Sequence, residues 1–311
     1  MFKKAIILLF LFFASCTPSL NKDKFVVSGT YLEVQSLDKR AAKVVYQEFR
    51  RLDSIFNSYK ESSESYKLNK SPNKAFKASN ELIEVIKAAK KYYQLSQGTF
   101  DITKAKLYNF WKKWGKESQD NKFPKAVKIE TLKSFGNIND LEIDQVNKTI
   151  KLKNKDTALD LSGIAKGYMV DKAVEKLKES GIKDALINAG GEIYCLGKNK
   201  GRPWQVGIRG PRGAIVKKIG ISDAAVATSG NYQQVYKQDG KVYSHIINPQ
   251  TGYPVVNNFL GITVVAKNCM KADILATVFF IKGKSFTKKV VKKEPSLEVY
   301  FVTEKGIEKI N

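Results

Sequence analysis

Apolar and polar residues recur along the chain with two periods, and these predict a mixture of helices and strands. Apolar residues spaced by about 3.6 positions predict helices over residues 37–59, 80–93, 270–281 and 284–293. Short apolar runs bounded by turn residues predict strands over residues 25–35, 184–189, 193–196, 204–208, 215–221, 224–228, 259–266 and 297–302. Because helices and strands do not alternate strictly, the pattern favours an α+β fold over a doubly wound parallel sheet.

The segments between these elements add smaller features. Residues 61–74 are polar and rich in Ser and Asn, which predicts a surface loop. An aromatic stretch predicts a helix in which Trp111 and Trp114 pack in the core. Residues 141–161 predict a hairpin followed by a strand. No repeat and no strong linker interrupts residues 25–311, so the sequence predicts one domain there.

Capping and turn residues set several of the expected boundaries. Asn80 is the predicted N-cap of helix 80–93, and Gly98 is predicted to end that helix. The segments 210–213 and 238–240 have the residues typical of hairpin turns. A short helix is expected near Ile129.

The stretch 159–171, Leu-Asp-Leu-Ser-Gly-Ile-Ala-Lys-Gly-Tyr-Met-Val-Asp, predicts a strand that turns at Ser162-Gly163 and continues as a helix. Backbone N–H groups at the start of a helix point at one spot together with the positive end of the helix dipole, which suits a phosphate. Lys166 would add a positive charge there, and Asp160 stands just before the turn. On this stretch alone, an ordinary glycine turn between strand and helix is an equally good interpretation.

Paired glycines follow the next predicted strand. Gly190-Gly191 stand at the end of strand 184–189, and Glu192 comes directly after them. Glycine pairs at a strand end allow a positive φ or a close approach of two backbones.

The N-terminus has the features of an export signal. A basic start, Met1-Phe-Lys-Lys4, precedes a continuously apolar run over residues 5–14, which is too short to span a bilayer. The run ends in Phe13-Ala-Ser-Cys16, which resembles the lipobox of bacterial lipoproteins. The sequence therefore predicts a signal peptide over residues 1–15, lipidation of Cys16 and a polar tether over residues 16–24, with a plain signal peptide as the alternative.

The chain is strongly basic, with a formal net charge of +24. Removing residues 1–15 removes Lys3 and Lys4 and no acidic residue, which lowers the charge by two, to +22. This charge favours acidic partners, such as an anionic membrane surface or a phosphate-bearing ligand. Nucleic acid is not the expected partner, because the lysines are scattered and an exported lipoprotein rarely meets it.

Four further residues carry candidate chemistry. Asp273 and Thr277 lie at positions i and i+4 of a predicted helix, so that both oxygens face one side. This pair suits a hard cation such as Mg²⁺, although a solvent-facing Asp beside a back-bonded Thr is the commoner arrangement. Cys195 and Cys269 lack metal-site spacing, and either a disulfide or two buried thiols would fit them.

His245 is the only histidine of the chain and stands in a segment rich in turn residues. A lone histidine is most often structural. The motif in which it stands, 245–252, is one of six that occur in a fixed order: GTFDIT at 98–103, LDLSGIAKGY at 159–168, NAGGE at 188–192, ATSG at 227–230, HIINPQTG at 245–252 and ADILAT at 272–277. Together they resemble the ApbE family of FAD:protein FMN transferases, from Phe25 to the C-terminus.

The resemblance implies an ApbE-type α+β fold with a T-fold-like core and a single catalytic domain over residues 25–311. It implies FAD contacts at the turn that contains Ser28 and at Tyr59, Thr99, Phe100, Asp101, Asp160, Lys166 and the backbone near Ile247. It also implies a divalent cation, Mg²⁺ or alternatively Mn²⁺, held by the Gly163 carbonyl, Asp273 and Thr277. His245 matches the family histidine suspected of activating the acceptor hydroxyl.

Two positions depart from the family pattern. Ser162-Gly163 stands where the family often has two glycines. A backbone carbonyl can still serve as a metal ligand there, because the change affects only a side chain. Asn248 stands where the family often has Asp, which argues against a role that needs a charge there.

The activity implied by the resemblance is a Mg²⁺-dependent transfer of FMN from FAD to a Thr or Ser hydroxyl of an acceptor flavoprotein, with AMP released. Lys166 would steady the pyrophosphate. The implied location is the periplasmic face of the bacterial inner membrane, with Cys16 as the lipid anchor. The alternatives are a Mg²⁺-dependent FAD pyrophosphatase that gives FMN and AMP, and a flavin-binding lipoprotein without catalysis.

Overall fold

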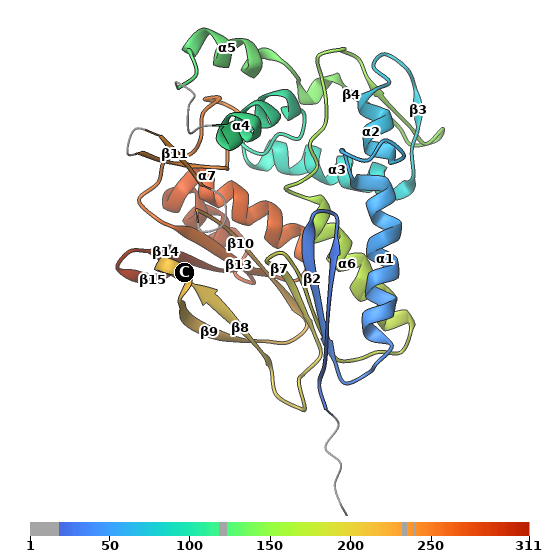
Figure 1. Cartoon of the computed structure of the whole chain (residues 1–311), viewed down its shortest axis with the longest axis vertical. Helices are drawn as coiled ribbons and strands as arrows, with labels where there is room; N and C mark the ends of the chain where they lie inside the picture. Colours follow the sequence, from blue (N-terminus) through green and yellow to red (C-terminus); the bar gives the residue numbers. More distant parts are fainter. Residues whose placement is uncertain (1–18, 118–122, 232–234, 239–240, 311) are drawn as a thin grey trace, which may run out of the picture.

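The computed structural model describes residues 19–117, 123–231, 235–238 and 241–310. Cys16 and the predicted signal peptide lie outside these residues. Helices and antiparallel strands build one domain around a large sheet (Figure 1). No helix within the described ranges is long and apolar enough to cross a membrane.

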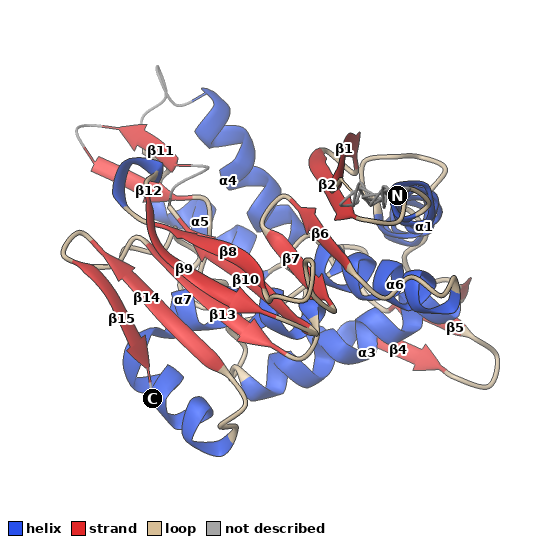
Figure 2. Cartoon of the chain, turned by 90° about the horizontal axis from the view of Figure 1, so that it is seen from below, coloured by secondary structure: helices blue, strands red, loops and turns tan. Residues whose placement is uncertain are grey.

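The large sheet has eight strands, and every neighbouring pair is antiparallel. In Figure 2 its strands lie side by side from β15 across to β2. In spatial order they are β1 (Asn21–Val27), β2 (Thr30–Ser36), β6 (Ala185–Ala189), β7 (Glu192–Leu196), β10 (Ala224–Gly230), β13 (Gly261–Ala266), β14 (Glu298–Thr303) and β15 (Gly306–Ile310). Every residue of the central strand β13 is buried, as its continuous apolar run predicts.

Three helices pack on one face of this sheet: α1 (Ala41–Phe56), α6 (Ala165–Glu179) and α7 (Cys269–Lys293). Helix α7 contains a non-helical residue, Gly283, with φ 75° and ψ −173°, so it consists of the two helices that the sequence predicts. The remaining helices are α2 (Glu64–Asn69), α3 (Asn80–Leu95), α4 (Ala105–Glu117) and α5 (Ala126–Ser134), together with the short 3₁₀ turns η1 (Ile138–Asp140) and η2 (Pro211–Gly213).

Smaller sheets complete the fold. The hairpin of β8 (Trp204–Arg209) and β9 (Ile215–Ile221) packs its buried side chains against the other face of the large sheet. A three-stranded sheet contains β3 (Phe76–Lys77), β5 (Thr149–Leu152) and β4 (Leu141–Asp144), and a further hairpin contains β11 (Val235–Gln238) and β12 (Lys241–Ser244). The predicted tryptophan packing is confirmed, because Trp111 and Trp114 are buried in a cluster with Ile129 of α5.

Four local predictions were wrong. The predicted strand 25–35 is a hairpin, because Ser28 and Gly29 both take positive φ, 53° and 71°, and reverse the chain. The Ser28 hydroxyl donates to Asp53 Oδ1 at 2.8 Å, which holds this unusual conformation. Part of the predicted loop 61–74 is helix α2, capped by Ser63.

The N-cap of α3 is Ser79, one residue before the predicted Asn80, and its side chain accepts from Leu82 N. The segment leading into α6 forms no strand, and only a single bridge joins Ala158 to Lys104. The closing strand β14 is followed by β15, which the sequence analysis did not predict. Strand β15 lies at the sheet edge, where its side chains lack the clear alternation that marks a half-buried strand.

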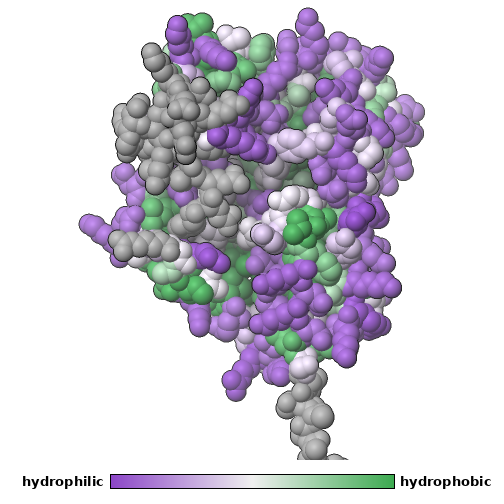
Figure 3. Space-filling model, in the orientation of Figure 1, coloured by the Kyte–Doolittle hydropathy of each residue, from purple (hydrophilic) through white to green (hydrophobic). Residues whose placement is uncertain are grey.

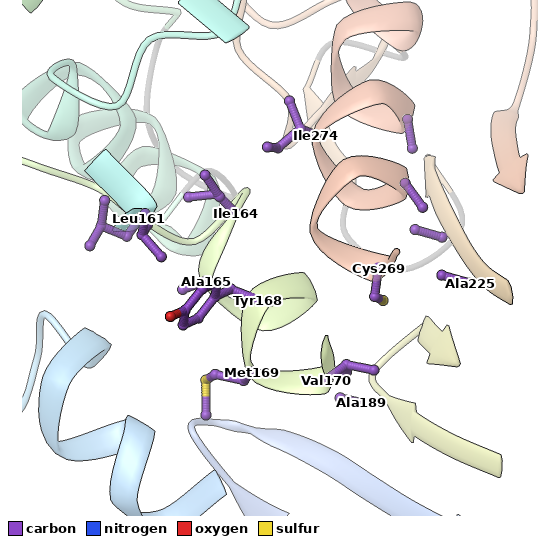
Figure 4. Packing of buried hydrophobic residues seen from close by; sticks show 14 of the residues in the cluster. Leu161, Ile164, Ala165, Tyr168, Met169, Val170, Ala189, Ala225, Cys269 and Ile274 are labelled. Atoms are coloured by element: carbon purple, nitrogen blue, oxygen red, sulfur yellow. The ribbon is translucent and has the colours of Figure 1, made fainter. Parts of the chain in front are cut away.

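Helices α6 and α7 touch backbone to backbone at Gly167. A Cβ atom on Gly167 would lie 2.6 Å from the carbonyl oxygen of Cys269 and 2.6 Å from Met270 Cα. One turn further along α6, the Asp171 carboxylate accepts from the N–H groups of Cys269 and Met270 at 2.6 and 2.9 Å, and so satisfies the first turn of α7. Figure 4 shows Cys269 at the start of α7 and the apolar side chains Ala165, Met169 and Val170 on the first turns of α6.

We expect Gly167→Ala to lower the free energy of unfolding by about 1–3 kcal/mol, because the added methyl group forces two helix backbones apart. Lys178→Ala, on the exposed side of the same helix, is the matched control and should change stability by less than about 0.5 kcal/mol. Urea unfolding followed by circular dichroism measures both. Equal stabilities of the two variants would contradict the close contact.

Candidate active site

A cleft with a volume of about 1390 Å³ opens where the N-terminal end of α6 meets α7 and the β6–β7 turn. In Figure 3 the surface is hollowed above the tip of the β1–β2 hairpin, on the face that holds this cleft. All of the site residues predicted from the sequence, other than Cys16, line it: Ser28, Tyr59, Thr99, Phe100, Asp101, Asp160, Gly163, Lys166, His245, Ile247, Asp273 and Thr277. The fold therefore brings together residues that lie up to about 250 positions apart in the sequence.

Three ionisable side chains meet at the centre of the cleft: the buried carboxyl groups of Glu192 and Asp273 and the half-buried ammonium group of Lys166. Lys166 Nζ lies 2.7 Å from Glu192 Oε1, and the backbone N–H of Gly167 donates to Asp273 Oδ2 at 3.2 Å. Burial, together with the negative charge of Glu192, raises the pKa of Asp273 to about 7, while Lys166 opposes this shift. Burial alone would lower the pKa of Lys166, but Glu192 and Asp273 hold it above its ordinary value.

Glu192 is a site residue that the sequence analysis did not assign. Its Oε2 atom is buried and has no hydrogen-bond partner among the described residues. The signal was an acidic residue directly after the glycine pair of the NAGGE motif. Once Asp273 has lost its proton, the centre holds two carboxylates and one ammonium group, and so has one excess negative charge.

The glycine pair before Glu192 confirms the predicted backbone geometry. Gly190 and Gly191 have φ angles of 74° and 118°. A Cβ atom on Gly190 would lie 2.2 Å from Thr30 Oγ1, so the β6–β7 turn approaches the tip of the β1–β2 hairpin closely. Asn188 Oδ1 accepts from Gly191 N at 2.9 Å and holds the turn that carries Glu192.

The residues around Asp273 fit a hard divalent cation. Thr277 lies one helical turn after Asp273, and its Oγ1 is 3.1 Å from Ser229 Oγ on β10. Within the part of the chain that the structure describes, no cluster of three or more His, Cys, Asp or Glu side chains could hold a metal. A cation here would therefore need hydroxyl and carbonyl oxygens beside the carboxylate, which is the donor chemistry that Mg²⁺ accepts.

The first half of the chain supplies the opposite wall of the cleft. Asp101 accepts from Thr103 N and Thr103 Oγ1 at 2.9 and 2.6 Å, and burial raises the pKa of its carboxyl group. Phe100 lies so close to Gly163 that a Cβ there would come within 3.3 Å of its ring. Asp160 Oδ1 accepts from Ser162 N at 2.8 Å, which fixes the turn that leads into α6.

For three other predicted residues, Thr99, Ile247 and Tyr59, contacts within the protein limit which of their groups can face a ligand. The Thr99 hydroxyl donates to the Ser96 carbonyl, so it is engaged in the turn itself. The Ile247 side chain packs in the cluster of Trp111 and Trp114, which leaves its backbone as the part that faces the cleft. Tyr59 is exposed at the rim, where its hydroxyl accepts from Lys112 Nζ at 2.9 Å.

His245 is half-buried on the cleft wall, directly before a turn. Asn248 builds that turn, because its side-chain oxygen accepts from Gln250 N at 3.0 Å and its carbonyl accepts from Gly252 N at 2.8 Å. The uncharged Asn248 side chain therefore makes the hydrogen bond that this turn needs, and no charge is required there. Cys195 and Cys269 are both free and buried, and burial raises the pKa of Cys195 to about 12.

The fold and the cleft define a single-domain α+β protein with a buried acidic centre between two crossing helices. The ApbE family model matches residues 28–301, and the chain belongs to the ApbE family. The curated protein named FAD:protein FMN transferase from Vibrio cholerae is 34% identical over 233 residues, 73% of this chain and 69% of that protein. The protein of the same name from Haemophilus influenzae is 31% identical over 261 residues, 81% and 75% of the two chains.

Solved structures agree with this assignment. The ApbE protein of Thermotoga maritima superposes with a TM-score of 0.82 at 28% identity, covering 94% of this chain and 97% of that one. The flavin transferase ApbE of Vibrio cholerae gives the same TM-score and identity, with 94% and 96% covered. The predicted fold, the family resemblance and the prediction of a transferase are thereby confirmed.

The raised pKa of Asp273 implies that the free energy of unfolding depends on pH. The folded protein keeps this proton up to about pH 7, whereas an unfolded Asp loses it near pH 4, so the contribution of Asp273 to stability falls as pH rises between these values. In EDTA, the free energy of unfolding of wild type should therefore decline more steeply than that of Asp273→Asn over this range.

Glu192→Gln should make the decline shallower, since it removes a negative neighbour and lowers the pKa of Asp273. Glu179→Gln, at the exposed end of α6, is the matched control and should behave as wild type. Urea unfolding at a series of pH values measures all four proteins. Parallel curves for wild type and Asp273→Asn would contradict the buried, protonated carboxyl.

Proposed function

We propose that the chain transfers the FMN moiety of FAD to a Ser or Thr hydroxyl of an acceptor protein, with release of AMP and with Mg²⁺ or Mn²⁺ as the cofactor. The proposal rests mainly on one observation: one cleft is lined by Lys166, Asp273, Thr277 and His245. The relatives of this chain are named FAD:protein FMN transferase, which agrees with it. A buried acidic centre next to a helix N-terminus suits a cation bound to a pyrophosphate.

The reaction exchanges one phosphorus–oxygen bond for another. The acceptor oxygen attacks the phosphorus of the FMN half, and the bond from that phosphorus to the oxygen of the AMP half breaks. The acceptor hydroxyl gives up its proton, and AMP leaves with the bridging oxygen. Negative charge grows on the phosphoryl oxygens during the exchange, so positive groups fixed around them lower the barrier.

The residues of the centre have distinct parts in this step. Lys166, held by Glu192, places an ammonium group next to the first turn of α6, where it binds pyrophosphate oxygens. The Gly163 carbonyl, Asp273 and Thr277 would hold the cation. When bound, the cation neutralises charge on the transferring phosphoryl group. Glu192 keeps Lys166 protonated and aimed at the same place.

His245 is the base of the proposed reaction. An imidazole that is neutral near pH 7 takes the proton of the acceptor hydroxyl as the new bond forms. The flavin and the rest of FAD occupy the wall made by Ser28, Tyr59, Thr99, Phe100, Asp101, Asp160 and the backbone at Ile247. Phe100 and Tyr59 supply aromatic surface, and Asp101 and Asp160 supply acceptors for polar edges.

The chain is further proposed to be a lipoprotein on the periplasmic face of the bacterial inner membrane, held by acyl chains on Cys16. The apolar run before Cys16 and the +22 charge of the remaining chain support this, because an anionic membrane surface attracts a basic protein.

We predict that His245→Ala binds FAD nearly as well as wild type but transfers FMN about 10²-fold more slowly or worse, which is the usual contribution of a positioned base. FAD affinity is measured by quenching of flavin fluorescence, and transfer by the rate of AMP release in the presence of an acceptor. Undiminished transfer would assign His245 a structural role.

We predict that Asp273→Asn folds normally but loses transfer activity or needs far more Mg²⁺, because a neutral amide oxygen replaces a charged ligand. The N-cap of α7 is Asn268, so Asp273 does not cap the helix. Transfer rate is measured against Mg²⁺ concentration, with EDTA as a control. Superimposable curves, or wild-type activity that resists EDTA, would refute the metal site.

We predict that Cys16→Ala leaves the protein without lipid and releases it from membranes or stalls its processing. Membrane fractionation and mass spectrometry of the mature N-terminus measure this. A variant that stays with membranes and is processed to the mature size would show that another feature, such as the basic surface, anchors it.

A further inference from the structure

The cleft extends beyond the residues assigned to FAD and the cation. Its volume of about 1390 Å³ exceeds the roughly 300–1,000 Å³ of a typical small-molecule pocket. The additional part runs along the face of the large sheet opposite α1, α6 and α7. We call it the sheet-side groove, and it is lined by Lys24, Tyr31, Glu33 and Gln35 from the β1–β2 hairpin and by Gln205 and Arg209 from β8.

One wall of the sheet-side groove is a face of the β1–β2 hairpin. Val26 pairs with Tyr31 and Lys24 pairs with Glu33 in the hairpin register, so these side chains share that face. Val26 and Tyr31 are 71% and 75% exposed, which is high for large apolar residues. Figure 3 shows an apolar patch over the hairpin tip, beside the hollow.

The floor of the groove leads to the catalytic centre. It contains Leu186 and Asn188 of β6, which stand opposite Gln35 and Glu33 in the strand register. Beyond Asn188 the same chain turns through Gly190 and reaches Glu192, the partner of Lys166. A molecule that lies in the groove can therefore extend directly to the reacting atoms.

The second wall is a strand with an unpaired edge. Within the described residues, β8 pairs only with β9. In Figures 1 and 2, β9 lies on the side of β8 toward β15, and the other edge of β8 faces the β1–β2 hairpin, with β7 between them. Such an edge offers backbone N–H and C=O groups with which an extended peptide can pair.

The charge of the groove favours an acidic occupant. The Arg209 guanidinium, at the end of β8, is exposed and has no hydrogen bond or ion pair with any residue the structure describes. Lys24 lies 3.7 Å from Glu33, which leaves the groove one net positive charge from Arg209.

We propose that the sheet-side groove binds an extended segment of the acceptor protein, which adds as a strand to the free edge of β8 and carries acidic residues next to the hydroxyl that receives FMN. This inference rests on the proposed transfer reaction and names the partner of the same site. The backbone pairing gives affinity for an extended chain, and Arg209 gives the preference for acidic side chains.

Two synthetic peptides of about ten residues, a length that fills one strand, test the proposal. Each has a central Thr in a background of Ala and Val, flanked by Asp in one peptide and by Lys in the other. Each is incubated with the enzyme, FAD and Mg²⁺, and the FMN adduct is measured by mass spectrometry. We expect the acidic peptide to be modified about tenfold faster, which corresponds to about 1.4 kcal/mol.

Arg209→Glu should remove or reverse this preference through the KM for the peptide. Lys218→Glu is the matched control, because Lys218 lies on β9 and does not line the cleft. Equal rates for the two peptides would refute the proposal that the groove binds an acidic acceptor segment. An Arg209→Glu variant that behaves like Lys218→Glu would refute it as well. Neither result would count against the transfer reaction itself. Cleavage of FAD to FMN and AMP without modification of either peptide would also overturn the groove.

Failure of the transfer reaction itself is recognised separately. If FAD is not cleaved under any of these conditions, the proposed function is wrong. Whether the groove binds an acidic peptide is then tested by a binding measurement alone. Hydrogen exchange with the acidic peptide, its Thr replaced by Val, should protect amides of Trp204–Arg209 and not those of the other sheet edge, Gly306–Ile310. Protection absent from β8, or equal at both edges, would overturn the proposal.

Discussion

The close contact of α6 and α7 at Gly167 is the constraint on which the rest of the site depends. Only a residue without a side chain lets the two backbones meet, and the same residue donates its N–H to Asp273. Asp171 then fixes the start of α7 from the next turn of α6. Lys166, one residue before Gly167, is thereby held beside Asp273, and the position of each charged group follows from a backbone contact.

This arrangement places two carboxylates and one ammonium group in a buried space. Removing charges from water is unfavourable, and an ion pair repays that only in part. Burial and the charge of Glu192 raise the pKa of Asp273 to about 7, and one oxygen of Glu192 lacks a partner among the described residues. A site with these properties would gain free energy if a cation bound, so the charges that weaken the folded chain are consistent with the proposed cation site.

Much of the fold follows from local sequence patterns, and the motifs contain the candidate site residues that the fold brings into one cleft. The periods of apolar residues correctly predict helices such as α1 and α3 and the buried strand β13, because these depend on which face of an element is covered. The hairpin at Ser28 and the edge strand β15 were missed. In the first, a non-glycine residue takes a positive φ and donates a hydrogen bond to Asp53, which lies 25 positions away in the sequence. In the second, pairing with β14 overrides a weak pattern.

The contacts between distant segments could not be read from the sequence. The pair of Lys166 with Glu192 joins two motifs that were each recognised, but neither motif indicates that the two side chains meet. The contact of Gly167 with α7 is equally invisible, since a glycine inside a helix usually predicts only a weaker helix. Such long-range geometry depends on the packing of the whole sheet, which brings residues of α6, β7 and α7 to one place.

FMN transfer by this protein is tested by analysing the reaction products. The protein is incubated with FAD, Mg²⁺ and an acceptor flavoprotein, and the acceptor mass, free FMN and AMP are quantified over time. We expect an FMN adduct on a Ser or Thr of the acceptor, with one AMP released for each adduct and none in EDTA. Free FMN and AMP in equal amounts with an unmodified acceptor would show a pyrophosphatase instead, and unchanged FAD would contradict catalysis altogether.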